Sequence, residues 1–197
     1  MKIALKMSLI GLSAAFAFAA AAQDTGGTVA EQFPVGTEPE VQVGQTFLVE
    51  NNGNWDLMCV KVAEGPQPCE IAQLVLDEQS KPIADIRLFP LPPGGQAIAG
   101  GTFVIPLGVV LPNGLNFAVD DAESRQYPFA FCNNIGCVAR VGFTPLELEA
   151  LRSGNEGKMT FRMINDPSKV VTLPLSLKGF SKSFAALQKR ILSQQEQ

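Results

Sequence analysis

From about Thr46 onward, the chain alternates short apolar runs with breaks rich in glycine, proline and asparagine. Apolar runs of this length, bounded by such residues, are typical of strands in an all-β domain. No helix-length run lies between them to serve as a parallel crossover, so a β-sandwich is favoured over a layered α/β fold. The predicted strands cover residues 46–50, 55–62, 69–77, 82–89, 96–105, 115–120, 127–132, 137–143, 157–164 and 169–175.

Two of the predicted strands alternate cleanly between apolar and polar residues. Their apolar positions are Leu115, Phe117 and Val119 in one strand, and Met159, Phe161 and Met163 in the other. Side chains two residues apart share a face of a strand, so each strand is predicted to have one buried and one solvated face. The tripeptide Pro112-Asn113-Gly114 predicts a turn just before the first of them.

A short helix is predicted inside the β-rich region. The tetrapeptide Thr144-Pro145-Leu146-Glu147 is a capping box with proline at the first helical position. Its threonine hydroxyl and glutamate carboxylate can accept hydrogen bonds from amides that have no intrahelical partner. Gly154 lies just past the expected end, where a left-handed residue is favoured.

A second helix is predicted at the C-terminus. Phe180, Phe184, Leu187 and Ile191 recur there at helical spacing, and the basic residues of the segment take other positions. Those basic residues are Lys182, Lys189 and Arg190. We expect this helix to dock its apolar stripe on the sandwich, with Phe180 and Phe184 as structural residues. Peripheral contact with a membrane surface, or with a partner, is the alternative.

Residues 1–22 have the layout of a bacterial secretory signal peptide. Lys2 and Lys6 give a positive start, an apolar run follows, and Ala20-Ala21-Ala22 offers small residues at the cleavage positions. The apolar run is shorter than the roughly 20 residues that a membrane-spanning helix needs. The sequence therefore predicts an exported chain that begins near Gln23.

The expected organisation after cleavage is simple. Residues 23–45 are polar and rich in glycine and proline, which predicts a flexible lead-in. Residues 46–192 form the sandwich domain with its C-terminal helix, and residues 193–197 form a tail. The apolar fraction of 46% and the charged fraction of 17% exclude a mostly disordered chain.

Composition excludes several chemistries. The chain has no histidine, so it has no Ser-His-Asp or Cys-His nucleophile pair, no histidine zinc site and no imidazole proton shuttle. The formal net charge is −4, and it becomes −6 once Lys2 and Lys6 leave with the signal peptide. An acidic chain with scattered basic residues has no electrostatic footprint for nucleic acid.

The four cysteines predict disulfides, because an even number in an exported chain is typical of a disulfide framework. Four cysteines allow three pairings, and the sequence alone does not choose among them. The local pairing of Cys59 with Cys69 and of Cys132 with Cys137 requires the least, and we predict it. A redox or zinc site is less favoured, because neither pair has Cys-x-x-Cys spacing and four-thiolate zinc sites use tighter pairs.

No residue is assigned a catalytic, cofactor or metal role. The cluster Asp120-Asp121 with Glu123 lacks the alternating oxygens of a calcium loop and predicts a solvated turn. The pairs Gly94-Gly95 and Gly100-Gly101 lack the lysine of a phosphate-binding loop and predict turns around a proline bend. Trp55, the only tryptophan, is expected to be a structural core anchor rather than a ligand platform.

Four motifs, in this order, resemble the invasion-associated locus B family of exported bacterial proteins, over about residues 50–190. They are Trp55-Asp56 with Cys59 and Cys69; Ile105-Pro106-Leu107-Gly108-Val109-Val110-Leu111 with Gly114; Pro128-Phe129 leading to Cys132, Gly136 and Cys137; and Ser176-Leu177 with Gly179-Phe180 and Ala186-Leu187. The resemblance implies an immunoglobulin-like β-sandwich located in the periplasm, at the outer membrane or outside the cell. No catalytic residues are known for the family.

The resemblance therefore implies a non-enzymatic envelope protein, acting as an interaction or envelope-support module. Its expected partner is a protein of the envelope or of a host surface, and no cofactor is implied. The first alternative is a host-directed adhesion or invasion factor, since the family is named for members linked to entry into host cells. The second is an enzyme with histidine-free carboxylate chemistry, for which a deep pocket with convergent acidic residues would be the sign.

Overall fold

The computed structural model of the protein describes residues 36–37 and 39–195. The expected signal peptide and most of the expected lead-in lie outside these residues. The described chain forms two antiparallel sheets with two α-helices, which confirms the predicted β-sandwich class. The strands are β1 (Thr46–Asn52), β2 (Trp55–Val60), β3 (Cys69–Leu76), β4 (Pro82–Pro90), β5 (Ala99–Ile105), β6 (Leu115–Val119), β7 (Arg125–Tyr127), β8 (Phe129–Cys132), β9 (Cys137–Phe143), β10 (Glu156–Met163) and β11 (Asp166–Ser176). The helices are the 3₁₀ turn η2 (Leu111–Asn113), α1 (Pro145–Ser153) and α2 (Phe180–Gln195).

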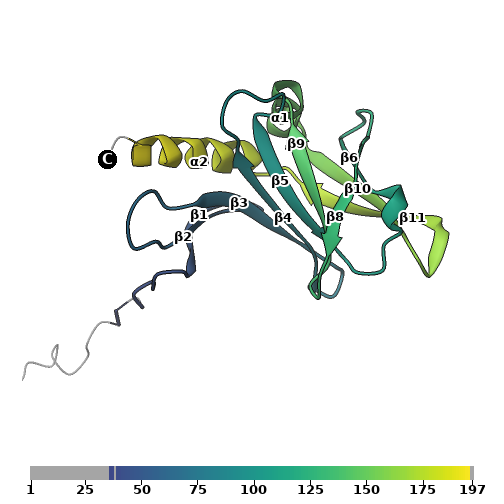
Figure 1. Ribbon diagram of the computed structural model, residues 1–197, viewed down its shortest axis with the longest axis horizontal. Coiled ribbons are helices and arrows are strands. Elements are labelled where there is room, and N and C mark those ends of the chain that lie inside the picture. The colour runs from purple at the N-terminus through teal and green to yellow at the C-terminus, as the bar shows by residue number, and fades with distance from the viewer. Residues whose placement is uncertain (1–35, 38, 196–197) are drawn as a thin grey trace, which may run out of the picture. The chain divides into compact units, whose positions relative to one another are not determined.

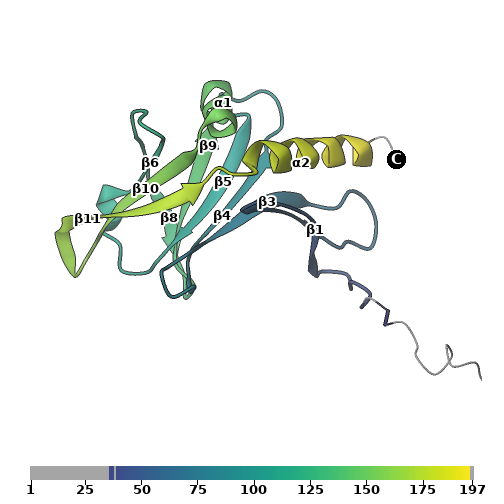
Figure 2. The ribbon, with the colours of Figure 1, turned by 180° about the vertical axis from the view of Figure 1, so that it is seen from behind.

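The larger sheet has seven strands in the order β1-β2-β3-β4-β5-β9-β8, and the smaller has four in the order β11-β10-β6-β7. The smaller sheet and α2 cover the same side of the larger sheet, with α2 over β1 to β3 (Figure 1). Figure 2 shows β11 leading into α2 along this side. The first five strands of the larger sheet form a meander, unlike the four-plus-three arrangement of an immunoglobulin constant domain. The immunoglobulin-like detail is therefore not confirmed.

The core between the sheets is aromatic. Phe103 and Phe143 come from the larger sheet and Phe117 from the smaller, and their ring centroids lie 5.4 to 6.3 Å apart. All three are buried, as are Met159 and Phe161 of the alternating strand β10. The predicted alternation is thus confirmed for β10, because its apolar residues face the core and the polar residues between them are partly exposed.

The strand predicted over residues 127–132 is wrong, because this segment contains two strands in different sheets. Tyr127 pairs with Leu115 in the smaller sheet, whereas Phe129 pairs with Ala139 in the larger. Pro128 lies between them. Proline has no N–H to donate and a fixed φ, so the ladder breaks there and the chain crosses from one sheet to the other.

Two glycine predictions also need correction. Gly100 and Gly101 lie inside β5 rather than in turns, and they leave room for aromatic rings: an added Cβ would lie 3.0 Å from the Phe89 ring and 2.9 Å from the Phe103 ring, respectively. Gly154 follows α1 with φ −76°, so it is not left-handed. Glycine is required at this position because the packing is close: an added Cβ would lie 2.5 Å from Cγ1 of Val119.

The predicted start of α1 is confirmed. The backbone N–H of Glu147 donates to the Thr144 hydroxyl at 3.4 Å, and the Thr144 N–H donates to the Glu147 carboxylate at 2.8 Å. These reciprocal bonds form the capping box. The turn predicted at 112–114 is the 3₁₀ turn η2, followed by Gly114 at φ 60°.

Helix α2 packs its apolar stripe into the core. Phe180, Phe184 and Leu187 are fully buried and Ile191 is partly buried, against β1, β2 and β3. The helix ends at Gln195, beyond residue 192 where the domain was expected to end. No helix in the described part of the chain combines the length and apolarity needed to cross a membrane.

Candidate interaction surface

The side of the larger sheet that points away from the smaller sheet and α2 carries no further layer of the described chain; we call it the outer face. Two rows of paired residues cross it from strand to strand. The first row contains Ala72, Arg87, Thr102 and Arg140, and the second contains Leu74, Asp85, Val104, Val138 and Phe131. Because side chains alternate along a strand, these residues point opposite to the core residues between them.

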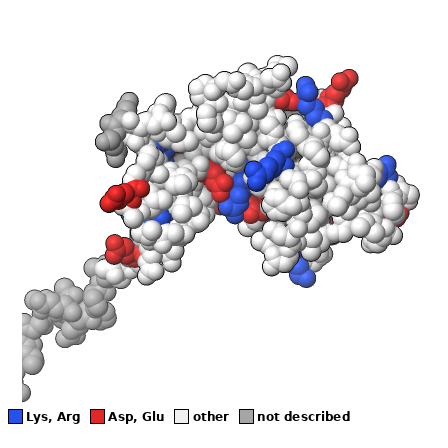
Figure 3. Space-filling model, viewed as in Figure 1, with Lys and Arg blue, Asp and Glu red and all other residues white. Residues whose placement is uncertain are grey.

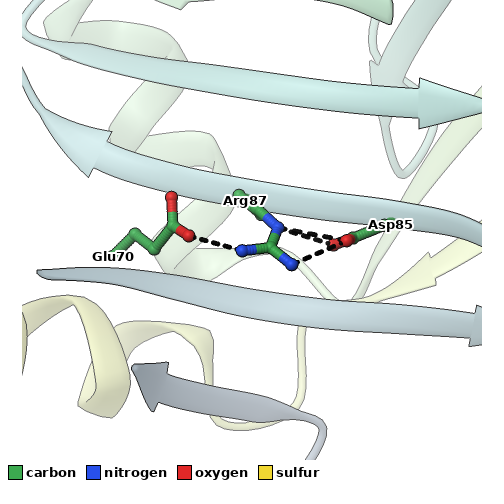
Figure 4. Close-up of polar contacts among 3 residues, drawn as sticks. All are labelled: Glu70, Asp85 and Arg87. Carbon is green, nitrogen blue, oxygen red and sulfur yellow. Dashed lines mark hydrogen bonds and ion pairs between the residues drawn. The ribbon is translucent and has the colours of Figure 1, made fainter. Parts of the chain in front are cut away.

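An ion-pair cluster lies on the outer face (Figure 4). The guanidinium of Arg87 lies between two carboxylates, with Nη1 2.7 Å from Glu70 Oε1 and Nη2 2.9 Å from Asp85 Oδ2. Its Nε also donates to Asp85 at 3.1 Å. These hydrogen bonds, above all those that Arg87 donates to Asp85, raise the pKa of Arg87 above its ordinary value. Both carboxylates therefore accept hydrogen bonds from Arg87.

Arg140 is the other cation of the two rows. It lies beside Thr102, is exposed, and makes no ion pair with any of the described residues. In the view of Figure 3, charged side chains are sparse, and basic and acidic ones adjoin near the middle of the molecule with uncharged surface on both sides. Arg140 thus offers a charge that the described chain does not neutralise.

An apolar region adjoins this cation on the outer face. Leu74 is 55% exposed, Phe131 is 48% exposed, and Ile135 in the β8–β9 loop is 77% exposed. Leu74, Asp85, Val104 and Ile135 are among the residues that line an open hollow of about 180 Å³. Exposed apolar side chains gathered beside polar ones are typical of protein interaction sites.

The structure joins Cys59 to Cys69 and Cys132 to Cys137, the two local pairs that we expected. Each pair links residues that are direct partners on neighbouring strands, β2–β3 and β8–β9. No described cysteine is free. The second disulfide closes the loop that presents Ile135, so it helps to shape the outer face.

The residues predicted as structural lie on the opposite side of the larger sheet. Trp55 and Phe184 are fully buried, and the ring of Phe180 lies between them, 5.1 Å from Trp55 and 5.7 Å from Phe184 by ring centroids. The Trp55 indole N–H donates to the Ser176 carbonyl at 2.9 Å. This group holds α2 and β11 on the sheet, and none of its rings is presented to a ligand.

The acidic cluster at 120–123 forms part of a turn. The Asp120 carboxylate accepts hydrogen bonds from the backbone N–H groups of Asn155 and Glu156, and Asp121 pairs with Lys158 at 3.5 Å. Within the described residues, no group of three or more histidine, cysteine, aspartate or glutamate side chains is placed to hold a metal ion. Glu123 and Glu147 line one small hollow, where Arg125 pairs with the Glu147 carboxylate.

The outer face was not foreseen from the sequence. A signal was present, because Asp85 and Arg87 alternate with Ile86 and Leu88 along one strand. That alternation places both charges on one face, but only the pairing of β3 with β4 brings Glu70 to Arg87. The relation of Arg140 to Thr102 likewise depends on strand order.

Both the sequence and the fold of this chain are similar to those of known proteins. A family model described as "Invasion associated locus B (IalB) protein" matches residues 55–188. Two relatives from Brucella abortus, strain 2308 and biovar 1 strain 9-941, are each named an invasion protein B homolog. Each is 25% identical over 186 residues, which covers 94% of either chain. The crystal structure of invasion associated protein B from Bartonella henselae matches with a TM-score of 0.64 and 23% identity, over 76% of this chain and 99% of that one.

Proposed function

Since this chain belongs to the invasion-associated locus B family, we propose that it is a non-enzymatic module of the bacterial envelope that binds another protein through its outer face. The observation that supports this most is the combination of exposed Leu74 and Phe131 with the unneutralised Arg140 on an uncovered sheet face. The family and the relatives reported above are named for invasion rather than for an enzymatic activity.

The composition of the outer face suits a protein partner. Aromatic residues and arginine are enriched at protein interfaces, and the residues that dominate binding energy include both. Phe131 and Arg140 are of these types and lie on adjacent strands. Both carboxylates of the cluster pair with Arg87, so a partner can cover the cluster without leaving either one unpaired, although one guanidinium against two carboxylates leaves a net negative charge.

Export is the second part of the proposal. Two disulfides suit an oxidising compartment, and the pattern of residues 1–22 suits a cleaved signal peptide. We propose that the mature protein lies in the periplasm, with association with the outer membrane or secretion as the alternatives. N-terminal sequencing of the exported form tests this part. A mature chain that begins near Gln23 supports it, and a chain that retains Met1 contradicts it.

A host-directed adhesion or invasion factor is the second candidate, and the names of the relatives favour it. The two functions differ in the location of the protein: a host-directed factor must expose its outer face outside the cell, whereas an envelope module needs it only within the envelope. Protease treatment of intact cells separates them: a protected chain supports an envelope role, whereas digestion without lysis supports a host-directed one. A periplasmic protein of known location serves as the control for cell integrity.

A pull-down with a matched variant tests the binding function itself. The disulfide-bonded mature chain serves as bait for envelope and host-surface extracts. Leu74→Glu places a charge in the apolar region of the outer face, and Val170→Glu places one at a comparably exposed position on β11 of the smaller sheet. We expect a protein that wild type and Val170→Glu capture and Leu74→Glu loses. Capture that is equal for all three baits contradicts a role for the outer face.

A further inference from the structure

We infer that the free edge of β8 is where the partner binds, by adding an extended segment to the larger sheet with an acidic side chain directed at Arg140. This inference rests on the proposed binding function and names its mode. Strand addition supplies affinity through main-chain hydrogen bonds and selectivity through alternate side chains. An antiparallel sheet with an exposed edge provides the main-chain groups that it requires.

The four edge strands of the two sheets differ in how they are protected. β11 contains Pro167, Pro174 and Lys169, and β7 has only three residues, one of them Arg125. Strand β1 contains a charged residue, Glu50, which pairs with Lys182 of α2. Strand β8 has the sequence Phe-Ala-Phe-Cys, with neither charge nor proline. Charges and prolines are usual devices that keep an edge from pairing with another chain, and the four residues of β8 include neither. Its shortness and the bulge between Phe129 and Phe131 are the two such devices that β8 does have.

The edge of β8 is also accessible. Ala130, Phe131 and Cys132 are exposed, and the strand lies at the end of the larger sheet with β9 as its neighbour. Among the described residues, no backbone hydrogen bond joins β8 to any strand other than β9. The Cys132–Cys137 disulfide fixes the end of this short strand to β9. A strand held in its bound conformation loses less conformational freedom when a partner pairs with it.

The position of Arg140 predicts an acidic residue in the added segment. Arg140 lies on β9, one strand inside the edge, so an added strand would lie about 10 Å from β9 at the usual strand spacing. A glutamate side chain of the added strand and the arginine side chain can together cover this distance. Phe131 points to the same face, so the neighbouring outward position of the added strand faces an apolar side chain. The predicted segment therefore alternates apolar and acidic residues on its outward side.

Two synthetic heptapeptides test this inference on the isotope-labelled, disulfide-bonded mature chain. Both alternate threonine with valine, and the central outward residue is glutamate in one and lysine in the other. We expect the glutamate peptide to shift the NMR amide signals of residues 129–132 and 138–140. The lysine peptide should bind roughly three- to tenfold more weakly, because it loses an exposed ion pair with Arg140 and gains a like-charge repulsion of similar size. Arg140→Glu should reverse this preference.

Two variants test the edge itself. Ala130→Pro at the bulge of β8 should abolish the shifts, and Phe131→Lys, which changes an exposed side chain, provides the same test if the proline variant does not fold. Three results would each overturn the inference. They are shifts confined to β1 or β11, no shifts with either peptide, or equal affinities of the two peptides that Arg140→Glu does not change. If these variants still capture the pull-down partner that Leu74→Glu loses, the partner does not bind at the edge of β8, but the proposed binding function stands. If Leu74→Glu loses no partner, the proposed function itself fails.

Discussion

The rings of Trp55 and Phe180 meet edge to face, with centroids 5.1 Å apart and planes at 77°. This contact joins the first residue of β2 to the first residue of α2. The hydroxyl of Ser183, one turn into the helix, also donates to the Trp55 carbonyl at 3.1 Å. Aromatic pairs in this geometry stabilise by more than their buried area alone. Helix α2 is therefore part of the core, and its docking leaves the outer face on the opposite side of the sheet uncovered.

Phe184→Ala should destabilise the fold by about 3–5 kcal/mol, because it empties a fully buried aromatic site beneath Arg152. Leu192→Ala, at a 62% exposed position of the same helix, should cost less than about 0.5 kcal/mol. Denaturant unfolding of both variants measures this, with vesicle co-sedimentation alongside. Unchanged stability of Phe184→Ala with loss of vesicle binding would instead support membrane contact by the helix.

Gly179→Ala should destabilise by about 3 kcal/mol or more. Gly179 has φ +92°, and an added Cβ would lie 1.8 Å from the Asn52 carbonyl oxygen, so both the conformation and the space require glycine. Gly65→Ala is the matched control, because Gly65 has φ +80° but open space around its Cβ position. That variant should show only the conformational cost, about 1–2 kcal/mol. Similar unfolding midpoints for the two variants would show that the Asn52 contact is unimportant.

Removal of the Cys59–Cys69 disulfide should loosen the end of α2. The loop that it closes presents Gln67, whose side chain accepts from Arg190 Nη2 at 3.1 Å and whose N–H donates to Gln194. The paired serine variant should lose about 2–3 kcal/mol for a loop of this size. Hydrogen exchange should rise in residues 190–195. The serine pair at Cys132 and Cys137 is the control, and equal exchange of α2 in both variants would refute the link.

The phenol of Tyr127 should titrate above its ordinary pKa of about 10, because burial disfavours the charged form and Glu147 adds repulsion. A raised pKa in the folded state means that this stabilisation is present below the unfolded pKa and is lost as pH rises through the folded one. Tyr127 is the only tyrosine, so tyrosinate absorbance reports on it directly. Glu147→Gln should lower the midpoint, and a midpoint equal to that of the denatured chain would contradict the prediction.

Local signals in the sequence were sufficient for much of this fold. The alternation around Phe161, the capping box at Thr144 and the helical stripe around Phe184 each depend on neighbours within a few residues, and the structure contains all three elements. The division at Pro128 was missed, because a short apolar run reads as one strand whether or not both halves join the same sheet. Proline inside that run was the available sign.

The outer face could not be predicted for a different reason. Glu70 and Arg87 are separated in sequence, and their contact depends on the register of β3 against β4. The exposure of Phe131 depends on which strand ends the sheet, a property of the whole topology. Periodicity identifies which residues share a strand face. It does not say which of the two faces the chain goes on to cover.

Site-specific photocrosslinking in the native bacterium tests the central claim most directly. A photoreactive residue replaces Thr102 at the centre of the outer face, or Thr160 at a half-buried position on the exposed side of the smaller sheet. Binding through the outer face predicts a discrete crosslinked protein for position 102 that is absent for position 160 and is lost when Leu74→Glu is added. A crosslinked protein at position 160 alone, or the same products at both positions, would contradict the assignment of the outer face as the binding surface.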